Sequence, residues 1–304
     1  MSVKTLVAVV VTLVFWSSAF AGIRAGLAGG YTPGHLVLLR FLSASAVFVI
    51  YALVRKIRIP QKQDLLRIAL LGWTGISIYH TSLTFGEQTV QAGTASLLIA
   101  AAPAFTALLA AYFLKERLSW IGWAGIVLGF AGIVLITLGS GHSQGFTVGA
   151  LLVLVSAVAT AIFFVFQKPL FQRYSAIELT AYFTWFGTLP MLIFLPGLWT
   201  QIQHATAAAT WSGVYIGVFP AAVAYVSWAV ALSSGRASAV SSALYVNPVL
   251  AIFIAWVWLG ELPHVVSIAG GVIAILGVIV VNLWGKAKDP VPTPVAQNAV
   301  QDTL

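Results

Sequence analysis

The side chains best able to bind a small molecule lie inside long apolar stretches of this sequence. Arg40, His80 and Asn247 each interrupt such a stretch. A charged side chain at the centre of a membrane costs about 2.5–3.5 kcal/mol on insertion scales, so residues of this kind mark functional sites or specific structural contacts. These three residues are therefore the first candidates for a binding site.

Arg40 lies roughly 9 Å into an apolar run that begins near position 34, at 1.5 Å per helical residue. Its guanidinium can hold a carboxylate through two parallel hydrogen bonds. In the alternative interpretation, Arg40 extends to the membrane boundary or ties helices together through backbone carbonyls.

His80 follows Tyr79 deep in another apolar run. An imidazole titrates near neutral pH, so it could relay a proton or contact a substrate. The alternative is a structural histidine that is bonded to a neighbouring helix. Tyr225, Ser227 and Trp228 are expected at the same depth in a later run and could form a wall of the same cavity.

Asn247 precedes Pro248, and Pro103 occupies a similar position in an earlier run. Proline inside a helix removes a hydrogen bond and clashes with the carbonyl one turn back, so both helices should bend near the membrane midplane. We expect Asn247 and Tyr245 to face a cavity, since an amide facing lipid is costly. The prolines act as structural kinks, as hinges of a gate, or as both.

Aromatic side chains fall into two groups. Trp16, Tyr182 and Trp185 lie inside apolar runs and could line the cavity. Most others are expected at the lipid-facing surface or at the membrane interface, where Trp and Tyr are enriched. Examples of this second group are Tyr31, Trp120, Trp199, Trp211 and Trp284.

Two segments of the chain, 93–118 and 238–263, are versions of one sequence set 145 positions apart. The matched pairs are Pro103 with Pro248, Glu116 with Glu261, Ser96 with Ser241, Ala110 with Ala255, Gly72 with Gly217, Ser82 with Ser227, Gly125 with Gly270, and Gly132 with Gly277. The chain is therefore an internal duplication. Both glutamates fall at the ends of apolar runs, where they should cap a helix or pair with loop groups.

Composition identifies lipid as the solvent. Of the 304 residues, 60% are hydrophobic and only 7% are charged, whereas soluble domains are about 25% charged. Apolar runs of membrane-spanning length lie at 5–25, 34–54, 66–86, 93–114, 120–138, 148–166, 178–196, 211–232, 238–258 and 265–284. The sequence thus predicts an all-α integral membrane protein with ten transmembrane helices.

The repeat contains an odd number of spans, five, so the second copy is inverted relative to the first. We expect a first repeat at 1–141, a second at 142–285, and a disordered cytoplasmic tail at 286–304. Inverted repeats in a membrane are typical of secondary transporters, whose substrate site lies near the bilayer midplane. Close approach of 120–138 and 265–284, both rich in glycine, would pack the two repeats or two protomers of a homodimer together.

Basic residues orient the ten spans. Thirteen of the fifteen Lys and Arg residues would lie on one side, which predicts that both termini are cytoplasmic. Those thirteen are Lys4, Arg55, Lys56, Arg58, Lys62, Arg67, Lys115, Arg117, Lys168, Arg173, Arg236, Lys286 and Lys288. They account for the net charge of +8, and their spread over short loops near lipid headgroups argues against nucleic-acid binding.

Several other classes are disfavoured. The absence of cysteine excludes disulfides and thiolate chemistry. There is no soluble domain or phosphate-binding loop for an ATP-driven motor, and no HExxH zinc motif or paired carboxylates. We therefore expect no cofactor and no metal. One alternative at the N-terminus is a signal peptide cleaved after the Ser-Ala-Phe-Ala of 18–21, which would leave nine spans.

Several motifs resemble the EamA family of the drug/metabolite transporter superfamily. They are Trp16-Ser17-Ser18-Ala19-Phe20, Arg40-Phe41, Ala101-Ala102-Pro103 with Lys115-Glu116-Arg117-Leu118, and Asn247-Pro248 with Gly260-Glu261. The resemblance covers 5–284 and implies a ten-helix carrier with a central cavity, of a kind that in bacteria exports amino acids or related metabolites. The superfamily's multidrug branch has a glutamate in its first helix, whereas 5–25 has no acidic residue.

The predicted function is secondary transport of a small metabolite, an amino acid or related compound, out of the cell across a bacterial inner membrane. Its partners would be this substrate and membrane lipid. Three alternatives stay open: a sugar-phosphate or nucleotide-sugar carrier of the same superfamily, an intramembrane lipid-modifying enzyme, and a channel.

Overall fold

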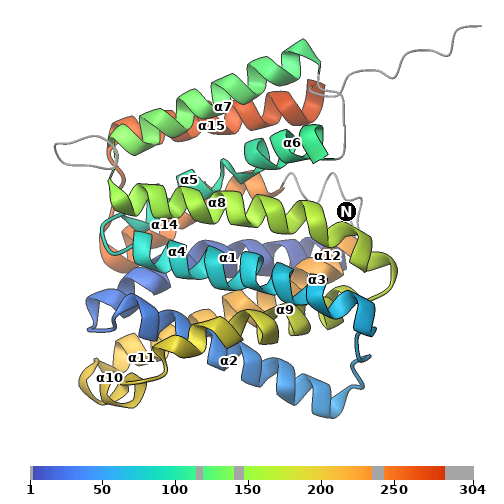
Figure 1. Cartoon of the computed structure of the whole chain (residues 1–304). Coiled ribbons are helices and arrows are strands. Elements are labelled where there is room, and N and C mark those ends of the chain that lie inside the picture. The colour runs from blue at the N-terminus through green and yellow to red at the C-terminus, as the bar shows by residue number, and fades with distance from the viewer. Residues whose placement is uncertain (1–2, 114–118, 140–146, 235–242, 285–304) are drawn as a thin grey trace, which may run out of the picture.

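The computed structural model describes residues 3–113, 119–139, 147–234 and 243–284 (Figure 1). All of its regular elements in these ranges are helices. Six of the described helical segments are long and apolar enough to cross a membrane, and three shorter apolar helices accompany them. The described residues of each of the ten predicted spans lie mainly in one helix or in consecutive helical pieces, as expected for a multi-pass membrane protein. Residues 114 and 238–242 of the predicted spans lie outside the described residues.

The first repeat begins with two long helices and continues through interrupted ones. Their bounds are α1 Val3–Ala28, α2 Pro33–Val54, α3 Lys62–Gly72, η1 Trp73–Ile78, α4 Tyr79–Gly86, α5 Ala92–Ile99, α6 Ala102–Phe113 and α7 Trp120–Gly139. Among these, η1 is a π-helical segment between α3 and α4.

The described part of the second repeat follows the same order of spans and includes further short helical pieces. Its bounds are α8 Val148–Gln167, η2 Lys168–Gln172, α9 Ala176–Met191, η3 Leu192–Phe194, α10 Leu198–His204, α11 Ala207–Val218, η4 Phe219–Val223, α12 Ala224–Ser234, η5 Ala243–Val246, α14 Asn247–Leu259 and α15 Val265–Trp284. Among these pieces, α10 follows the span that contains α9.

Irregular backbone occurs at matched positions of the two repeats. The π-helical segments η1 and η4 both end 145 positions apart, at Ile78 and Val223. Likewise α6 starts at Ala102 and α14 at Asn247, again 145 positions apart. Each helix restarts one residue before a proline, because proline is tolerated in the first turn of a helix but not in its interior. The predicted bends are therefore breaks between two helical pieces.

Glycine allows the last helices of the two repeats, α7 and α15, to lie side by side (Figure 1). A methyl group on Gly132 would come within 2.6 Å of the Gly270 carbonyl oxygen, and one on Gly277 within 2.6 Å of the Gly125 carbonyl oxygen. The predicted glycine contact is thus made between repeats of one chain. A larger residue would force the two backbones apart.

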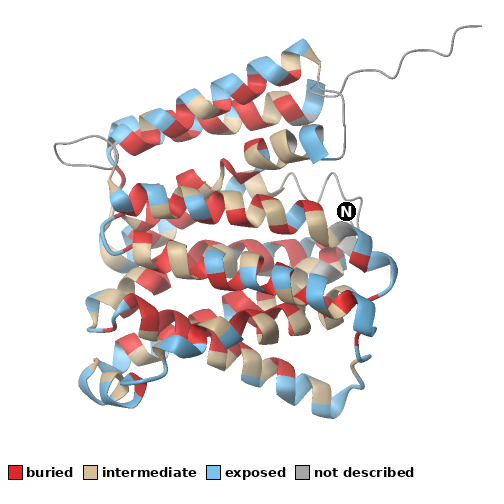
Figure 2. Ribbon diagram, in the orientation of Figure 1, coloured by how far each residue is buried: buried red, intermediate tan, exposed pale blue. Residues whose placement is uncertain are grey.

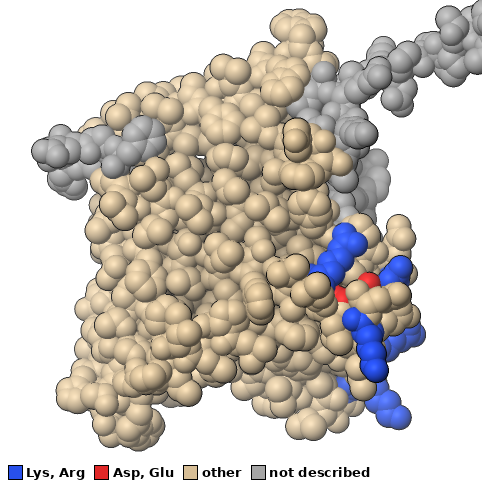
Figure 3. All heavy atoms as spheres, in the orientation of Figure 1, with Lys and Arg blue, Asp and Glu red and all other residues tan. Residues whose placement is uncertain are grey.

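Charge is segregated along the bundle. On the face drawn in Figure 3, the Lys and Arg side chains gather at one end, which also carries the N-terminus. We call this the basic end; its described residues include Arg55, Lys56, Arg58, Lys62, Arg67 and Arg173, all exposed. Buried residues concentrate between the helices, whereas the outer faces of the bundle are largely apolar and exposed (Figure 2).

One aromatic expectation is wrong. Tyr31 is buried rather than interfacial, and its hydroxyl is 2.9 Å from that of Thr210. Tyrosine can bury its ring when its hydroxyl finds a partner, which only the packing of α11 provides here. Trp120, Trp199, Trp211 and Trp284 are exposed as expected. The predicted tail, 286–304, lies outside the described residues, as does Glu116.

Candidate functional site

Arg40 is enclosed by protein. On α2, its side chain is 3% exposed, and its guanidinium carbon lies 5.4 Å from the centroid of the Phe41 ring. Its Nε and Nη1 have no hydrogen-bond partner among the described residues. Two donors of a buried cation are therefore available to a ligand.

His80 packs against Phe41, the residue that follows Arg40 on α2. Its ring centroid is 4.6 Å from that of Phe41 and 4.3 Å from that of Tyr79. The imidazole is buried, and neither nitrogen has a hydrogen-bond partner among the described residues. Because Tyr79 and His80 form the first turn of α4 directly after η1, the π-helical segment sets the direction in which they point. Such segments are frequent at functional sites.

Tyr225 is the counterpart of His80 in the second repeat. Each residue lies two positions beyond a π-helical segment. Tyr79 and Tyr225 are both near enough to Arg40 to act on its charge electrostatically. His80, which contacts Phe41, and Tyr225, which contacts Trp16, are thus equivalent positions of the two repeats in the region around Arg40.

Trp16 of α1 extends this site along α12. Its ring centroid is 5.3 Å from that of Tyr225 and 5.5 Å from that of Trp228. Its Nε1 donates a hydrogen bond to the Pro220 carbonyl within η4, at 3.2 Å. Two of the predicted site residues, Trp16 and Trp228, are therefore in contact, and Trp16 also contacts Tyr225.

Asn247 joins the same region from α14. The Ser17 hydroxyl, next to Trp16, donates to Asn247 Oδ1 at 2.7 Å. Asn247 therefore bonds a helix of the other repeat at the point where the chain restarts as α14. Tyr245 lies just before it in η5. Pro248 is buried and Pro103 is exposed, so the two matched breaks differ in their surroundings.

Tyr182 and Trp185 lie elsewhere. They form a perpendicular pair on α9, with ring centroids 5.2 Å apart, and Trp185 Nε1 donates to the Ser45 carbonyl at 3.4 Å. Trp185 packs on the cluster of Phe48 and Ala222, away from Trp16. The predicted aromatic wall is thus divided between two places.

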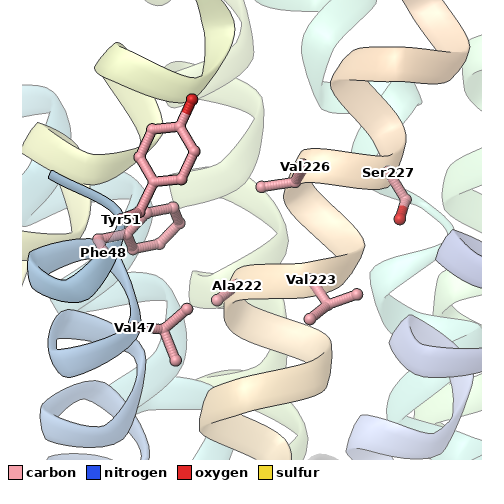
Figure 4. A pocket seen from close by; sticks show the side chains of 7 residues that line it. All are labelled: Val47, Phe48, Tyr51, Ala222, Val223, Val226 and Ser227. Atoms are coloured by element: carbon pink, nitrogen blue, oxygen red, sulfur yellow. The ribbon is translucent and has the colours of Figure 1, made fainter. Parts of the chain in front are cut away.

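A cleft of about 170 Å³ opens beside that cluster, between α2 and the η4–α12 segment. Figure 4 shows Val226 directed across it toward Tyr51 and Phe48, while Ser227 points to another side of α12. Its lining residues are Val47, Phe48, Tyr51, Ala222, Val223, Val226 and Ser227. The cleft is mostly apolar and begins one to two turns beyond Arg40 along α2, toward the basic end.

Two ionisable residues were missed by the sequence analysis. Glu87, at the end of α4, is 0% exposed, and neither carboxylate oxygen has a hydrogen-bond partner among the described residues. Arg24 donates from Nη1 to the Glu87 backbone carbonyl at 2.7 Å and pairs with Glu261 at 2.8 Å. Glu87 follows an apolar run and so resembles an interfacial residue; only the packing of other helices buries it.

Glu261 itself pairs with groups of the other repeat. Besides Arg24, it accepts a hydrogen bond from the Ala92 backbone N–H at 3.2 Å. We call the end of the bundle that holds Arg24 and Glu261 the Arg24 end. Of the two expected roles, capping a helix or pairing with loop groups, Glu261 has the first, because it accepts from the first N–H of α5; its ionic partner is on α1.

Duplicated helices, matched breaks at mid-span and a polar site enclosed between the repeats define a multi-pass membrane carrier. The EamA-like transporter family matches residues 3–138 and again 147–283. The chain belongs to this family and is a transporter, not an intramembrane enzyme.

Similar proteins carry the same assignment. An uncharacterized transporter of Bacillus subtilis, YdfC, is 42% identical over 86% of both chains. A probable terminal-alkyne amino-acid exporter of Streptantibioticus cattleyicolor is 41% identical over 92% of this chain and 93% of that protein. An uncharacterized inner membrane transporter of Escherichia coli, YedA, is 29% identical over 94% of each.

A solved crystal structure of another protein has the same fold. It is 21% identical to this chain and superposes with a TM-score of 0.63 over 93% of this chain and 99% of the other.

Proposed function

We propose that this transporter moves an amino acid or a related compound outward across a bacterial inner membrane by alternating access. The observation that carries the proposal is the buried Arg40, whose Nε and Nη1 have no partner among the described residues. A carboxylate is the group that a guanidinium binds with two parallel hydrogen bonds. The likeness to the Streptantibioticus cattleyicolor protein supports the substrate class and the outward direction.

In this proposal the wider site consists of side chains from both repeats. Arg40 binds the substrate carboxylate, while Tyr79, His80, Trp16, Trp228 and Asn247 surround the rest of the molecule. Pro103 and Pro248 mark the helix breaks about which the repeats move. Tyr182, Trp185, Ser227 and Tyr245 would contact the substrate along its path. Both termini are cytoplasmic, and the repeats divide between 141 and 142.

Counterflow in proteoliposomes tests the proposal. Vesicles containing the purified protein are loaded with a pooled metabolite panel and diluted into traces of labelled panel members, and the compounds that exchange are identified by mass spectrometry. We expect one class of amino acids to exchange, and Arg40→Ala to abolish this exchange. Arg55→Ala, an exposed arginine that directly follows the same helix, is the control. Exchange of phosphorylated sugars in place of amino acids would refute the proposal.

A further inference from the structure

Among the described residues, three ionisable side chains are buried and have nitrogen or oxygen atoms without a hydrogen-bond partner. They are Arg40, His80 and Glu87, which are 3%, 3% and 0% exposed. The other buried carboxylate among the described residues, Asp64, is bonded to Arg173 and Tyr174. A buried charge without a partner is strongly unfavourable, so a fold retains it when something else supplies the partner.

The Glu87 carboxylate is left free by a specific arrangement. Glu87 caps the C-terminus of α4, where its backbone N–H donates to the Leu83 carbonyl at 2.9 Å. Arg24 donates to the backbone carbonyl of Glu87, and directs Nε and Nη2 to Glu261 at 2.9 and 2.8 Å. The guanidinium nearest to Glu87 is therefore already bonded to other groups.

Arg40 is a second positive charge in this region, because α2 packs against α4, the helix that Glu87 ends. The Phe41 and His80 ring centroids are 4.6 Å apart at this contact, and no ion pair joins Arg40 to Glu87 among the described residues. They come from different helices, α2 and the end of α4. A ligand that carries a negative and a positive group could satisfy both at once.

We propose that Glu87 binds the ammonium group of the substrate while Arg40 binds its carboxylate, so that the site selects zwitterionic α-amino acids. This inference rests on the proposed function and assigns to Glu87 the specificity within it. A 2-hydroxy acid would offer the Glu87 carboxylate a neutral hydroxyl in place of a cation, so its buried charge would stay uncompensated, and an amine would leave Arg40 unpaired. Sites that hydrogen-bond a substrate group reject analogues lacking it by large factors, because buried polar groups then have no partner.

A structural role for Glu87 makes a different prediction. If its carboxylate only balances the charge of Arg24, then neutralising it would disturb the contacts at the Arg24 end. Every substrate would then be transported more slowly by a similar factor. The preference among substrates separates the two roles.

The experiment is counterflow with three matched sets of probes. L-alanine, L-leucine and L-phenylalanine are each compared with the corresponding 2-hydroxy acid and the corresponding decarboxylated amine. For the amino acid that exchanges best, we expect the wild-type protein to prefer it to its 2-hydroxy acid by about 100-fold or more. In Glu87→Gln that preference should fall at least about tenfold, with exchange of the hydroxy acid retained.

Glu178→Gln is the matched control. Its carboxylate lies at the basic end and accepts hydrogen bonds from the Ser175 and Arg58 backbone N–H groups. This variant should keep the wild-type preference. Glu87→Asp retains the charge, so it should keep the preference for the amino acid while exchanging it more slowly. This variant replaces Glu87→Gln in the experiment if Glu87→Gln does not fold.

Two results would overturn the assignment of Glu87. One is a wild-type protein that exchanges 2-hydroxy acids as well as amino acids; the other is a Glu87→Gln protein that slows both equally. Either can occur while amino acids are still exchanged, which leaves the proposed function standing. If the wild-type protein exchanged no amino acid, both the proposed function and the assignment of Glu87 would be refuted.

Discussion

Arg24 and Glu261 join the two repeats through an ion pair, with Nη2 of the arginine 2.8 Å from Oε1 of the glutamate. Arg24 lies near the end of α1, and Glu261 follows α14. The side chains are 25% and 17% exposed, so water screens this pair only partly. Together with the bond from Ala92 and the bond to the Glu87 carbonyl, the pair ties α1 to the ends of α4 and α14 and to the start of α5.

We expect Glu261→Gln to loosen this end. Loss of a partly buried ion pair costs about 1–2 kcal/mol, between the values for surface and buried pairs, and should make the interior about tenfold more accessible. Because the chain has no cysteine, the test is the rate at which an impermeant maleimide labels Ser18→Cys, a buried position on α1. Glu178→Gln is the control, and an unchanged labelling rate in Glu261→Gln would contradict the prediction.

Alanine should lower the stability of the fold more at Gly132 than at Gly129, although both glycines lie on α7. At Gly132 the new methyl group would lie 2.6 Å from the Gly270 carbonyl oxygen, and backbone cannot yield cheaply, so we expect destabilisation of about 1–3 kcal/mol. At Gly129 the nearest neighbour is the Ala104 methyl at 3.6 Å, an ordinary contact. Thermal unfolding in detergent should show a lower Tm for Gly132→Ala than for Gly129→Ala. Equal Tm values would mean that α7 and α15 do not pack this closely.

Asp64 should make stability depend on pH at the basic end. The hydrogen bond from the Tyr174 hydroxyl, followed by the hydrogen bonds and charge of Arg173, holds the pKa of Asp64 below its ordinary value of 3.8. The ionised carboxylate therefore stabilises the fold above that value, and this contribution is lost as the pH falls through the lowered pKa.

Asp64→Asn lacks this contribution. Its Tm should be below that of the wild-type protein at about pH 7, and the difference should shrink as the pH falls below about 4. Tyr174→Phe removes the 2.8 Å hydrogen bond to Asp64 Oδ2. In this variant the Tm should change less with pH than in the wild-type protein. A difference that is constant across this range would show that Asp64 is not the titrating group.

Topology can be tested with reporter fusions. If both termini are cytoplasmic, a reporter active only in the periplasm should be silent after Trp284 and active after His204, at the end of α10. Fusions after Arg55, at the basic end, should also be silent. A strong signal after Trp284 would overturn the predicted orientation.

The duplication accounts for the part of the fold that could be predicted. Apolar length fixes the spans, and proline fixes where a helix cannot continue, so the breaks before Pro103 and Pro248 follow from local chemistry. The close packing of α7 and α15 likewise follows from the glycines in their sequences. In contrast, the π-helical segment η1 carries no recognisable local signal, although it directly precedes Tyr79 and His80. Its counterpart η4 contains Pro220, a residue that disturbs a helix locally.

Residue type and spacing along the chain are sufficient to predict the solvent, the helices, their inverted repetition and the family. The pairing of Arg24 with Glu261, the burial of Tyr31 and the lack of a described partner for the Glu87 carboxylate appear only in the folded structure. Burial of a residue at the end of a helix depends on which other helices cover it. That covering comes from segments far apart in the sequence, and no local pattern encodes it.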